Sequence, residues 1–161
     1  MAKYLLAVLL FVPMTIKVDK VPNLYTHSAV YKQIRRIKPD IEPRLALEVT
    51  EAVYKACGTF KVNPRLLVAI LMQESKFDPK AVNKVTHDYG LAQINIKTAK
   101  SYKFDLKRLK TEPKYSIFAA GLILNDFHKM YGNKEKNAWS RYNGSNPEKR
   151  KIYEQLVARY L

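Results

Sequence analysis

Apolar residues recur every three or four positions along most of the chain, a spacing that predicts α-helices rather than strands. One helix is expected at residues 24–37, because Pro39 would interrupt any longer one. A second should begin at Pro43 and end near Gly58, where glycine favours termination. A third should occupy residues 64–75, since it follows the favourable N-cap Asn63.

The second half of the chain returns to this helical pattern after a turn-rich stretch at residues 77–93. Helices are expected at residues 117–130, after Pro113, and at about residues 147–161. Polar and apolar residues do not alternate for long enough to form a regular strand, so only a small hairpin near residues 85–89 is expected. The pattern therefore predicts one compact, mainly α-helical domain.

The first residues differ from the rest of the chain. Residues 1–16 form a signal-like or anchor-like segment, with Lys3 followed by thirteen uncharged, mostly apolar residues. A helix of that length would span about 20 Å, whereas a bilayer core is about 30 Å thick. The segment is therefore typical of a secretory signal, although Pro13-Met14-Thr15-Ile16 lacks the usual small residues of a cleavage site. The folded domain is then expected at residues 17–161. The alternative is that residues 1–16 form a buried N-terminal helix or strand of the fold.

Composition limits the class of protein. The 161 residues are 47% hydrophobic, which is enough to build a core, and 29 Lys and Arg against 14 Asp and Glu leave a net charge of +15. Such a charge indicates a polyanionic partner, namely nucleic acid, an anionic membrane or the bacterial cell wall. Cys57 is the single cysteine, so an internal disulfide and a thiolate metal cluster are excluded, and we expect a buried thiol.

The most informative residue is Glu74, near the end of the third predicted helix. It follows Leu67, Ile70 and Leu71 at the spacing of one helix face, so its carboxyl group shares an apolar stripe. Burial would raise the pKa of this carboxyl group, as a general acid near neutral pH requires. The alternative is that the side chain turns outward to water at the end of the helix.

Three short motifs in this region resemble those of the lytic transglycosylase catalytic domain. They are Glu-Ser-x-Phe-x-Pro-x-Ala at residues 74–81, Gly-Leu-Ala-Gln-Ile at 90–94, and Tyr-Asn-Gly at 142–144, with Tyr153 following. The resemblance covers roughly residues 53–157 and keeps the motifs in family order. It implies a lysozyme-like helical domain of the goose type, with the small hairpin near the active-site cleft, that acts on peptidoglycan.

The reaction that this resemblance implies uses one carboxyl group. Glu74 would protonate the glycosidic oxygen between N-acetylmuramic acid and N-acetylglucosamine, and would then take the proton of the C6 hydroxyl as the 1,6-anhydro ring closes. The alternative is a muramidase, in which Asp88 would activate water about 6.5–9.5 Å from Glu74. We favour a simpler role for Asp88, as a cap of the turn before Tyr89 and Gly90.

The same resemblance indicates the residues that bind substrate. Gln93 would hydrogen-bond a sugar, Tyr142 would orient Glu74 or the N-acetyl group, and Gly90 would let the backbone approach the glycan. The remaining expected contacts are Ser75, Asn83 and Asn143. Two positions depart from the family, because Ala92 replaces the methionine of the second motif and Asn83 replaces a common serine.

No cofactor or metal is expected, because His27, His87 and His128 lack the spacing of metal ligands. The basic residues at 107–110 are interpreted as a solvated face, so nucleic acid is not an expected partner. We expect a monomeric, exported enzyme of the periplasm or envelope, acting on peptidoglycan and serving an envelope-spanning secretion or conjugation apparatus, or else a phage lysis or virion enzyme. The remaining alternative is a non-catalytic basic module that binds cell wall or nucleic acid.

Overall fold

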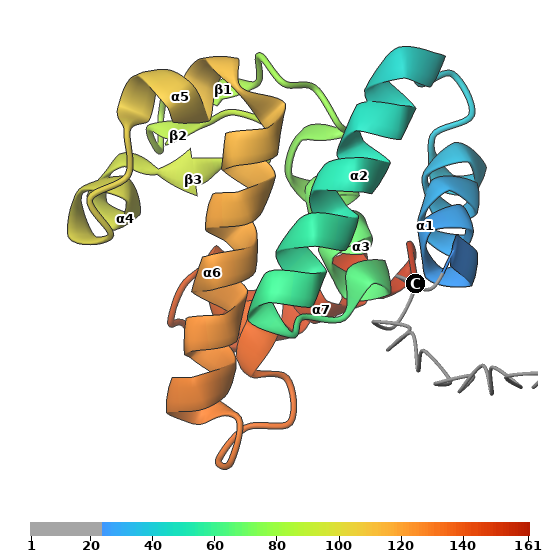
Figure 1. Ribbon diagram of the computed structural model, residues 1–161. Helices are drawn as coiled ribbons and strands as arrows, with labels where there is room; N and C mark the ends of the chain where they lie inside the picture. Colours follow the sequence, from blue (N-terminus) through green and yellow to red (C-terminus); the bar gives the residue numbers. More distant parts are fainter. Residues whose placement is uncertain (1–23) are drawn as a thin grey trace, which may run out of the picture.

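The computed structural model describes residues 24–161, so the predicted signal-like segment at residues 1–16 lies outside the described residues. Helices account for most of this part of the chain, and a small sheet lies at one end of it (Figure 1). The expected mainly α-helical, lysozyme-like domain is confirmed. Its elements are α1 (Leu24–Ile37), α2 (Pro43–Phe60), α3 (Pro64–Ser75), β1 (Val82–Asn83), β2 (Asp88–Tyr89), β3 (Ile94–Asn95), α4 (Ile96–Ser101), α5 (Leu106–Thr111), α6 (Pro113–Tyr131), the 3₁₀ helix η1 (Ala138–Asn143) and α7 (Pro147–Ala158).

Prolines mark the starts of four helices, namely α2, α3, α6 and α7. Proline suits the first helical position because its fixed φ matches the helix and its missing N–H would have no helical partner there. The side chains of Glu42 and Asn63 accept hydrogen bonds from the free N–H groups at the starts of α2 and α3. The predicted starts of these two helices are therefore confirmed.

Three predicted boundaries are wrong. α2 continues through Gly58 to Phe60, and it ends where Lys61 adopts a left-handed conformation (φ 59°) and donates its N–H to the Cys57 carbonyl. α6 begins at Pro113, one turn before the predicted start, and α7 ends at Ala158. Gly58 does not end its helix because the left-handed residue that does so lies three positions later.

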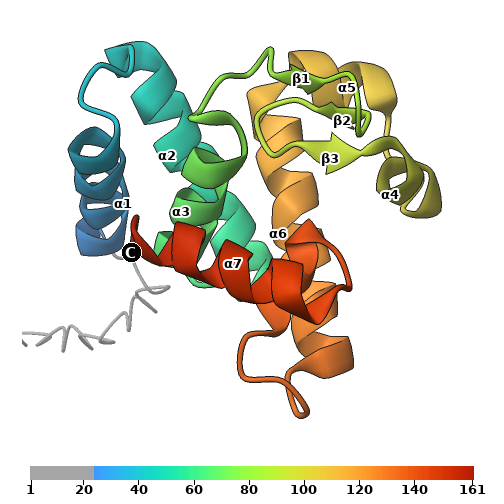
Figure 2. The same ribbon diagram turned by 180° about the vertical axis from the view of Figure 1, so that it is seen from behind.

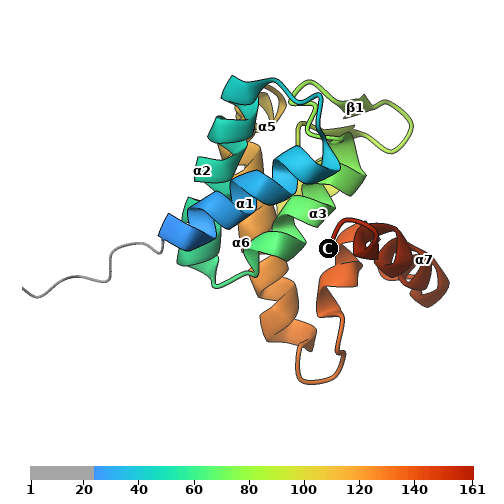
Figure 3. The ribbon, with the colours of Figure 1, turned by 90° about the vertical axis from the view of Figure 1, so that its right-hand side faces the viewer.

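The core lies where α2, α3 and α6 meet, and Val53, Leu67, Ile70 and Ile117 are fully buried in it. Helix α1 lies across α2 and α3 (Figure 3) and buries Ile34 against them. Helix α7 packs on α3 from another side (Figure 2). Helix α3 is therefore enclosed along most of its length, and its last turn, which carries Glu74, is half-buried.

The small sheet is antiparallel, with strand order β1-β2-β3. Val82 pairs with Tyr89, and Asp88 pairs with Asn95, so the hairpin predicted at residues 85–89 is part of a larger meander. The chain leaves β3 directly into α4 (Figure 2). α4, α5 and η1 were not predicted, because six residues are too few to establish a helical period.

Candidate active site

Glu74 lies in a cleft of about 440 Å³. The walls come from both halves of the chain, since the sheet and α4 contribute one side and α6, η1 and α7 the other. The lining residues are Glu74, Thr86, Asp88, Gln93, Ile94, Asn95, Thr98, Ile123, Phe127, Arg141, Tyr142, Asn143, Gly144 and Lys149. Of the predicted site residues, the fold thus brings Glu74, Asp88, Gln93, Tyr142 and Asn143 to one cavity.

The environment of Glu74 favours the neutral acid. Burial raises the pKa of its carboxyl group to about 7, and the nearby charge of Asp88 adds to the rise. The hydroxyl of Tyr153 donates a hydrogen bond to Glu74 Oε1 over 2.5 Å, which acts in the opposite direction. The Glu74 side chain is half-buried in the wall of the cleft rather than turned outward to bulk water, and its pKa is shifted in the direction that its spacing on α3 predicts. Its role as the acid stays a prediction.

Tyr153 is a residue of the site that follows the third sequence motif but had no role predicted for it. Its ring is buried on α7, and burial beside Glu74 raises the pKa of its phenol far above the ordinary range. It therefore stays protonated and acts only as a donor toward Glu74. A signal was available, because Tyr153 and the buried Val157 are four residues apart on one face of the last helix.

Tyr142 lines the same cleft but makes a different contact. Its hydroxyl donates to the carbonyl of Ala92 at 2.8 Å, so the hydrogen bond to Glu74 that we expected of Tyr142 comes from Tyr153. The bond joins η1 to the loop before β3, fifty positions earlier in the chain. Tyr142 thus fixes the two sides of the cleft relative to each other, and a contact with an N-acetyl group stays a prediction.

The side-chain amide of Gln93 has one half bound within the protein and one half available to a substrate. It has a positive φ of 47°, and its side-chain NH₂ donates to the carbonyls of Ala81 and Gly90. Among the described residues its carbonyl oxygen makes no hydrogen bond, so that acceptor remains for a sugar hydroxyl or amide. The alternative of a polar helix start is wrong, since Gln93 lies in the turn before β3.

Asp88 does not cap a turn. Its carboxylate lines the cleft and accepts hydrogen bonds from two side chains, the amide of Asn95 at 2.7 Å and the hydroxyl of Thr86. The predicted cap is therefore wrong, because β2 pairs Asp88 with Asn95 and directs its side chain to that partner rather than to a turn amide. Asp88 acts on Glu74 through its charge.

Three predicted substrate contacts do not line the cleft and have structural partners instead. Ser75 donates its hydroxyl to the carbonyl of Leu91 at 2.6 Å, and Asn83 accepts from two amides of the β1–β2 turn. Gly90 faces the backbone of Leu109, and a Cβ built there would lie 2.0 Å from the Leu109 oxygen. These residues shape the loops that carry Gln93 and Asp88.

A charged cluster holds the η1 side of the cleft. Glu135 accepts hydrogen bonds from Arg141 at 2.5 Å and from Arg150 at 2.7 Å, and these contacts lower the pKa of its carboxyl group to about 2. The Arg141 guanidinium also lies 3.8 Å from the ring centre of Tyr131. Because Arg141 immediately precedes Tyr142, the cluster positions the segment that lines the cleft.

Other features add nothing to the chemistry. Within residues 24–161 the structure has no group of three His, Cys, Asp or Glu side chains placed to hold a metal ion. Over the same residues, the helices are too short or too polar to span a bilayer. Cys57 is buried, as predicted, and burial raises the pKa of its thiol to about 12.

Comparisons with known proteins cover the part of the chain that forms this cleft. The family model of the transglycosylase SLT domain matches residues 51–156, which include every residue that lines the cleft. Protein IpgF of Shigella flexneri is 34% identical, in a match that covers 66% of this chain and 77% of IpgF. The invasion protein IagB of Salmonella typhimurium is 31% identical, over 58% of this chain and 62% of IagB. No solved structure matches the chain significantly.

Proposed function

The chain belongs to the transglycosylase SLT domain family, which acts on peptidoglycan, and we propose that it cleaves the glycan strands with Glu74 as its single acid and base. The observation that supports this proposal best is that the environment of Glu74 favours its protonated form. Its carboxyl group is held in the cleft by Tyr153, and its pKa is raised to about 7, so a large share is protonated near neutral pH. A general acid must hold a proton before the reaction begins.

The proposed reaction proceeds in two proton transfers. The carboxylic acid of Glu74 gives its proton to the glycosidic oxygen, and the N-acetyl group of the same muramic acid residue stabilises the positive charge that develops at the anomeric carbon. The resulting carboxylate then takes the proton of the C6 hydroxyl as that oxygen bonds to the anomeric carbon. Glu74 ends protonated and water is not consumed, so the products are one free 4-hydroxyl end and one 1,6-anhydro end.

The hydrogen bond from Tyr153 serves both halves of this cycle. It engages one carboxyl oxygen, Oε1, so in this proposal the other oxygen, Oε2, carries the proton that is transferred. It also stabilises the carboxylate that forms after the first transfer, because an O–H donor interacts more strongly with a charged acceptor. Tyr153 is in this proposal a positioning residue rather than a catalytic one.

The competing function is a muramidase in which Asp88 activates water. Both oxygens of Asp88 already accept a hydrogen bond, from Asn95 and from Thr86, so both are engaged by protein donors instead of being free to take a proton from water. This arrangement supports the reaction that uses Glu74 alone.

Mass analysis of the fragments released from purified cell-wall sacculi tests the proposal directly. A transglycosylase should release muropeptides that end in 1,6-anhydromuramic acid, which are lighter by one water than the products of hydrolysis. Reducing ends would instead establish the muramidase, and binding without release would establish the non-catalytic module.

The pH dependence of kcat/KM gives a second prediction. Because Glu74 must be protonated, kcat/KM should fall as pH rises through about 7, the pKa of this carboxyl group. In Tyr153→Phe the hydrogen bond that lowers this pKa is lost, so the midpoint of the fall should move to higher pH. Tyr142→Phe is the matched control, since Tyr142 bonds to Ala92 and not to Glu74.

These two profiles separate positioning from packing. If the midpoint of Tyr153→Phe stayed where it is in the native protein, or moved to lower pH, Tyr153 would have only a packing role. A shift of the same size in Tyr142→Phe would show that any change in the cleft moves the midpoint, and the assignment to Tyr153 would fail.

The place of action follows from the substrate. Peptidoglycan lies outside the cytoplasmic membrane, and we propose that residues 1–16 direct export to the periplasm or envelope. The relatives IpgF and IagB come from bacteria, and IagB is named an invasion protein, which favours a bacterial envelope enzyme over the phage alternative. Service to a secretion or conjugation apparatus stays a prediction.

A further inference from the structure

A strongly basic patch on the described surface lies on α4, α5 and the loop between them. This segment, which we call the lysine lobe, has six basic residues and one acidic residue between Lys97 and Lys110. All six basic side chains are exposed. The patch is formed by Lys97, Lys100, Lys103, Lys107, Arg108 and Lys110.

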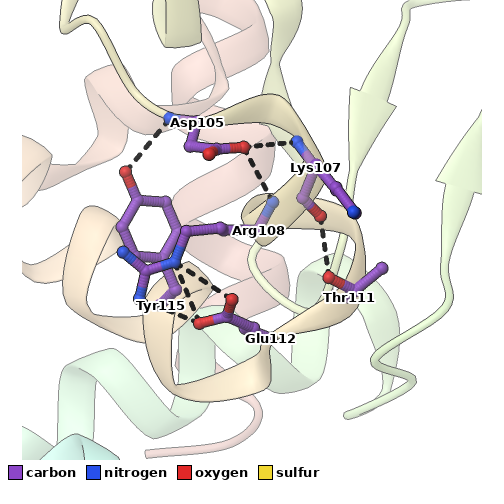
Figure 4. Close-up of polar contacts among 6 residues, drawn as sticks. All are labelled: Asp105, Lys107, Arg108, Thr111, Glu112 and Tyr115. Carbon is purple, nitrogen blue, oxygen red and sulfur yellow. Dashed lines mark hydrogen bonds and ion pairs between the residues drawn. The ribbon is translucent and has the colours of Figure 1, made fainter.

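Two carboxylates at α5, those of Asp105 and Glu112, already accept hydrogen bonds (Figure 4). Asp105 caps α5 by accepting from the backbone amides of Lys107 and Arg108, and Glu112 binds the Arg108 guanidinium at 2.9 Å. The ammonium group of Lys107 points away from both (Figure 4). Among the described residues, the ion pairs include none for Lys97, Lys100, Lys103 or Lys107. The lobe therefore presents uncompensated positive charge.

The lobe adjoins the candidate active site. Asn95 and Thr98 both line the cleft, and Lys97 lies between them in the chain at the start of α4. Lys100 and Lys103 follow as the chain leaves the cleft. A strand bound in the cleft would therefore have the lobe beside it.

The aromatic residues of the lobe argue against nucleic acid. Single-stranded nucleic acids bind through aromatic faces on which bases stack. Tyr102 and Phe104 stack on each other, with ring centres 5.2 Å apart, and the edge of Phe104 meets Tyr115. The Tyr115 face is itself covered by Arg108 at 4.2 Å, so these rings serve packing.

The apolar residues of the lobe argue against insertion into a lipid surface. Leu109 is buried in the core, and Ile96 and Leu106 are half-buried. Insertion into a membrane interface requires large apolar side chains beside the basic ones, so only adsorption by charge would remain for a lipid surface. The lobe thus fits a hydrated, carboxylate-bearing polymer.

We propose that the lysine lobe binds the carboxylates of the peptides attached to peptidoglycan, and so holds a peptide-bearing strand while its glycan lies in the cleft. This inference rests on the proposed function, because it takes the glycan to be the occupant of the cleft. It adds a second recognition element, which gives the enzyme a preference for strands that carry peptides over bare glycan.

The test compares two variants with the same change in net charge. The lobe variant is Lys97→Glu, Lys100→Glu, Lys103→Glu and Lys107→Glu, and the control variant is Lys32→Glu, Lys134→Glu, Lys136→Glu and Arg159→Glu. The control positions are exposed, lie outside the cleft lining and have no ion pair among the described residues. Both sets are made with and without Glu74→Gln, and circular dichroism checks that each is folded.

Binding to sacculi is measured in the Glu74→Gln background, where turnover does not interfere. The lobe variant should bind at least about tenfold more weakly than the control variant at low salt, since each exposed ion pair contributes a modest amount. The difference should vanish near 1 M salt, where the Debye length is about 3 Å. In the active background, kcat/KM should fall more on peptide-bearing strands than on strands stripped of peptide by an amidase.

Several outcomes would overturn the inference. Equal losses in the two variants would mean that total charge, and not the lobe, holds the enzyme on the wall. An equal loss of kcat/KM on bare and on peptide-bearing strands would exclude the peptide carboxylates as the ligand. Tighter binding to DNA or to anionic vesicles than to sacculi would indicate a different partner. Failure of the proposed function would look different, because sacculi would then release no fragments even with the native protein.

Discussion

Glu74→Gln is expected to reduce turnover of sacculi by about 10²–10⁴-fold, the range that general acid–base catalysis contributes. Glutamine keeps the size of the side chain and can still accept the hydrogen bond from Tyr153, but it has no proton to give. Release of muropeptides measures turnover, and cosedimentation with sacculi should show that binding is kept. Glu148→Gln, an exposed change outside the cleft lining, should keep full activity.

The stability of Glu74→Gln provides an independent check on the buried carboxyl group. The pKa of Glu74 rises from 4.5 to about 7 on folding, so its stabilising contribution is present at low pH and is lost as pH rises through 7. Removing the group should therefore raise the free energy of unfolding above pH 7, by up to about 3 kcal/mol. Denaturant unfolding at pH 5 and pH 8 measures the difference.

The two measurements exclude the trivial explanation of lost activity. A variant that is inactive and more stable at pH 8 has lost chemistry rather than its fold. Retention of more than about a tenth of the native activity, well above the loss expected of a general acid and base, would contradict the assignment of Glu74. A fall in stability at pH 8 would contradict the burial that explains its raised pKa.

The part of this site that could be predicted from the sequence is local. Glu74 follows Leu67, Ile70 and Leu71 on one helix face, so helical periodicity places it on the same side of α3 as these buried residues, although periodicity alone left open that its side chain turns outward. The starts of α2 and α3 follow from local proline and cap signals, which act within one turn. Such features need no knowledge of what packs on the helix.

The part that could not be predicted depends on contacts between distant residues. Tyr153 meets Glu74 across 79 positions, and Tyr142 meets Ala92 across 50. No local pattern distinguishes which of two tyrosines near the end of the chain reaches the acid. Both belong to the same short region, and the turn of α7 relative to η1 decides between them.

The role of Gly90 also depends on a contact with a distant residue, although its sequence motif was recognised. The family motif and its positive φ of 73° both suggest a glycine chosen for backbone freedom, which we assigned to approach by the glycan. The structure places the Leu109 carbonyl against this position instead, from α5, a helix that the sequence did not reveal. The role of Gly90 therefore depends on an element nineteen residues away.

Gly90→Ala is accordingly expected to lower the stability of the fold, and its effect should be large. The new Cβ would lie 2.0 Å from the Leu109 oxygen, and the backbone has a φ that alanine adopts only with strain. Overpacking and a left-handed conformation together should lower the free energy of unfolding by about 3–5 kcal/mol, a large share of the roughly 5–15 kcal/mol of an ordinary domain. Thermal unfolding followed by circular dichroism should show Tm lower by about 10–15 °C.

Gly58→Ala is the matched control, because it makes the same chemical change where the fold has room for it. A Cβ at Gly58 meets nothing within 4 Å, and the residue lies inside α2. Alanine there should raise the free energy of unfolding by about 0.5–1 kcal/mol, since glycine is the poorer helix former. If Gly90→Ala instead kept the native Tm and lost only affinity for glycan, Gly90 would be a substrate contact after all. The opposite signs expected at the two glycines follow from their neighbours alone, since the residue and its replacement are the same.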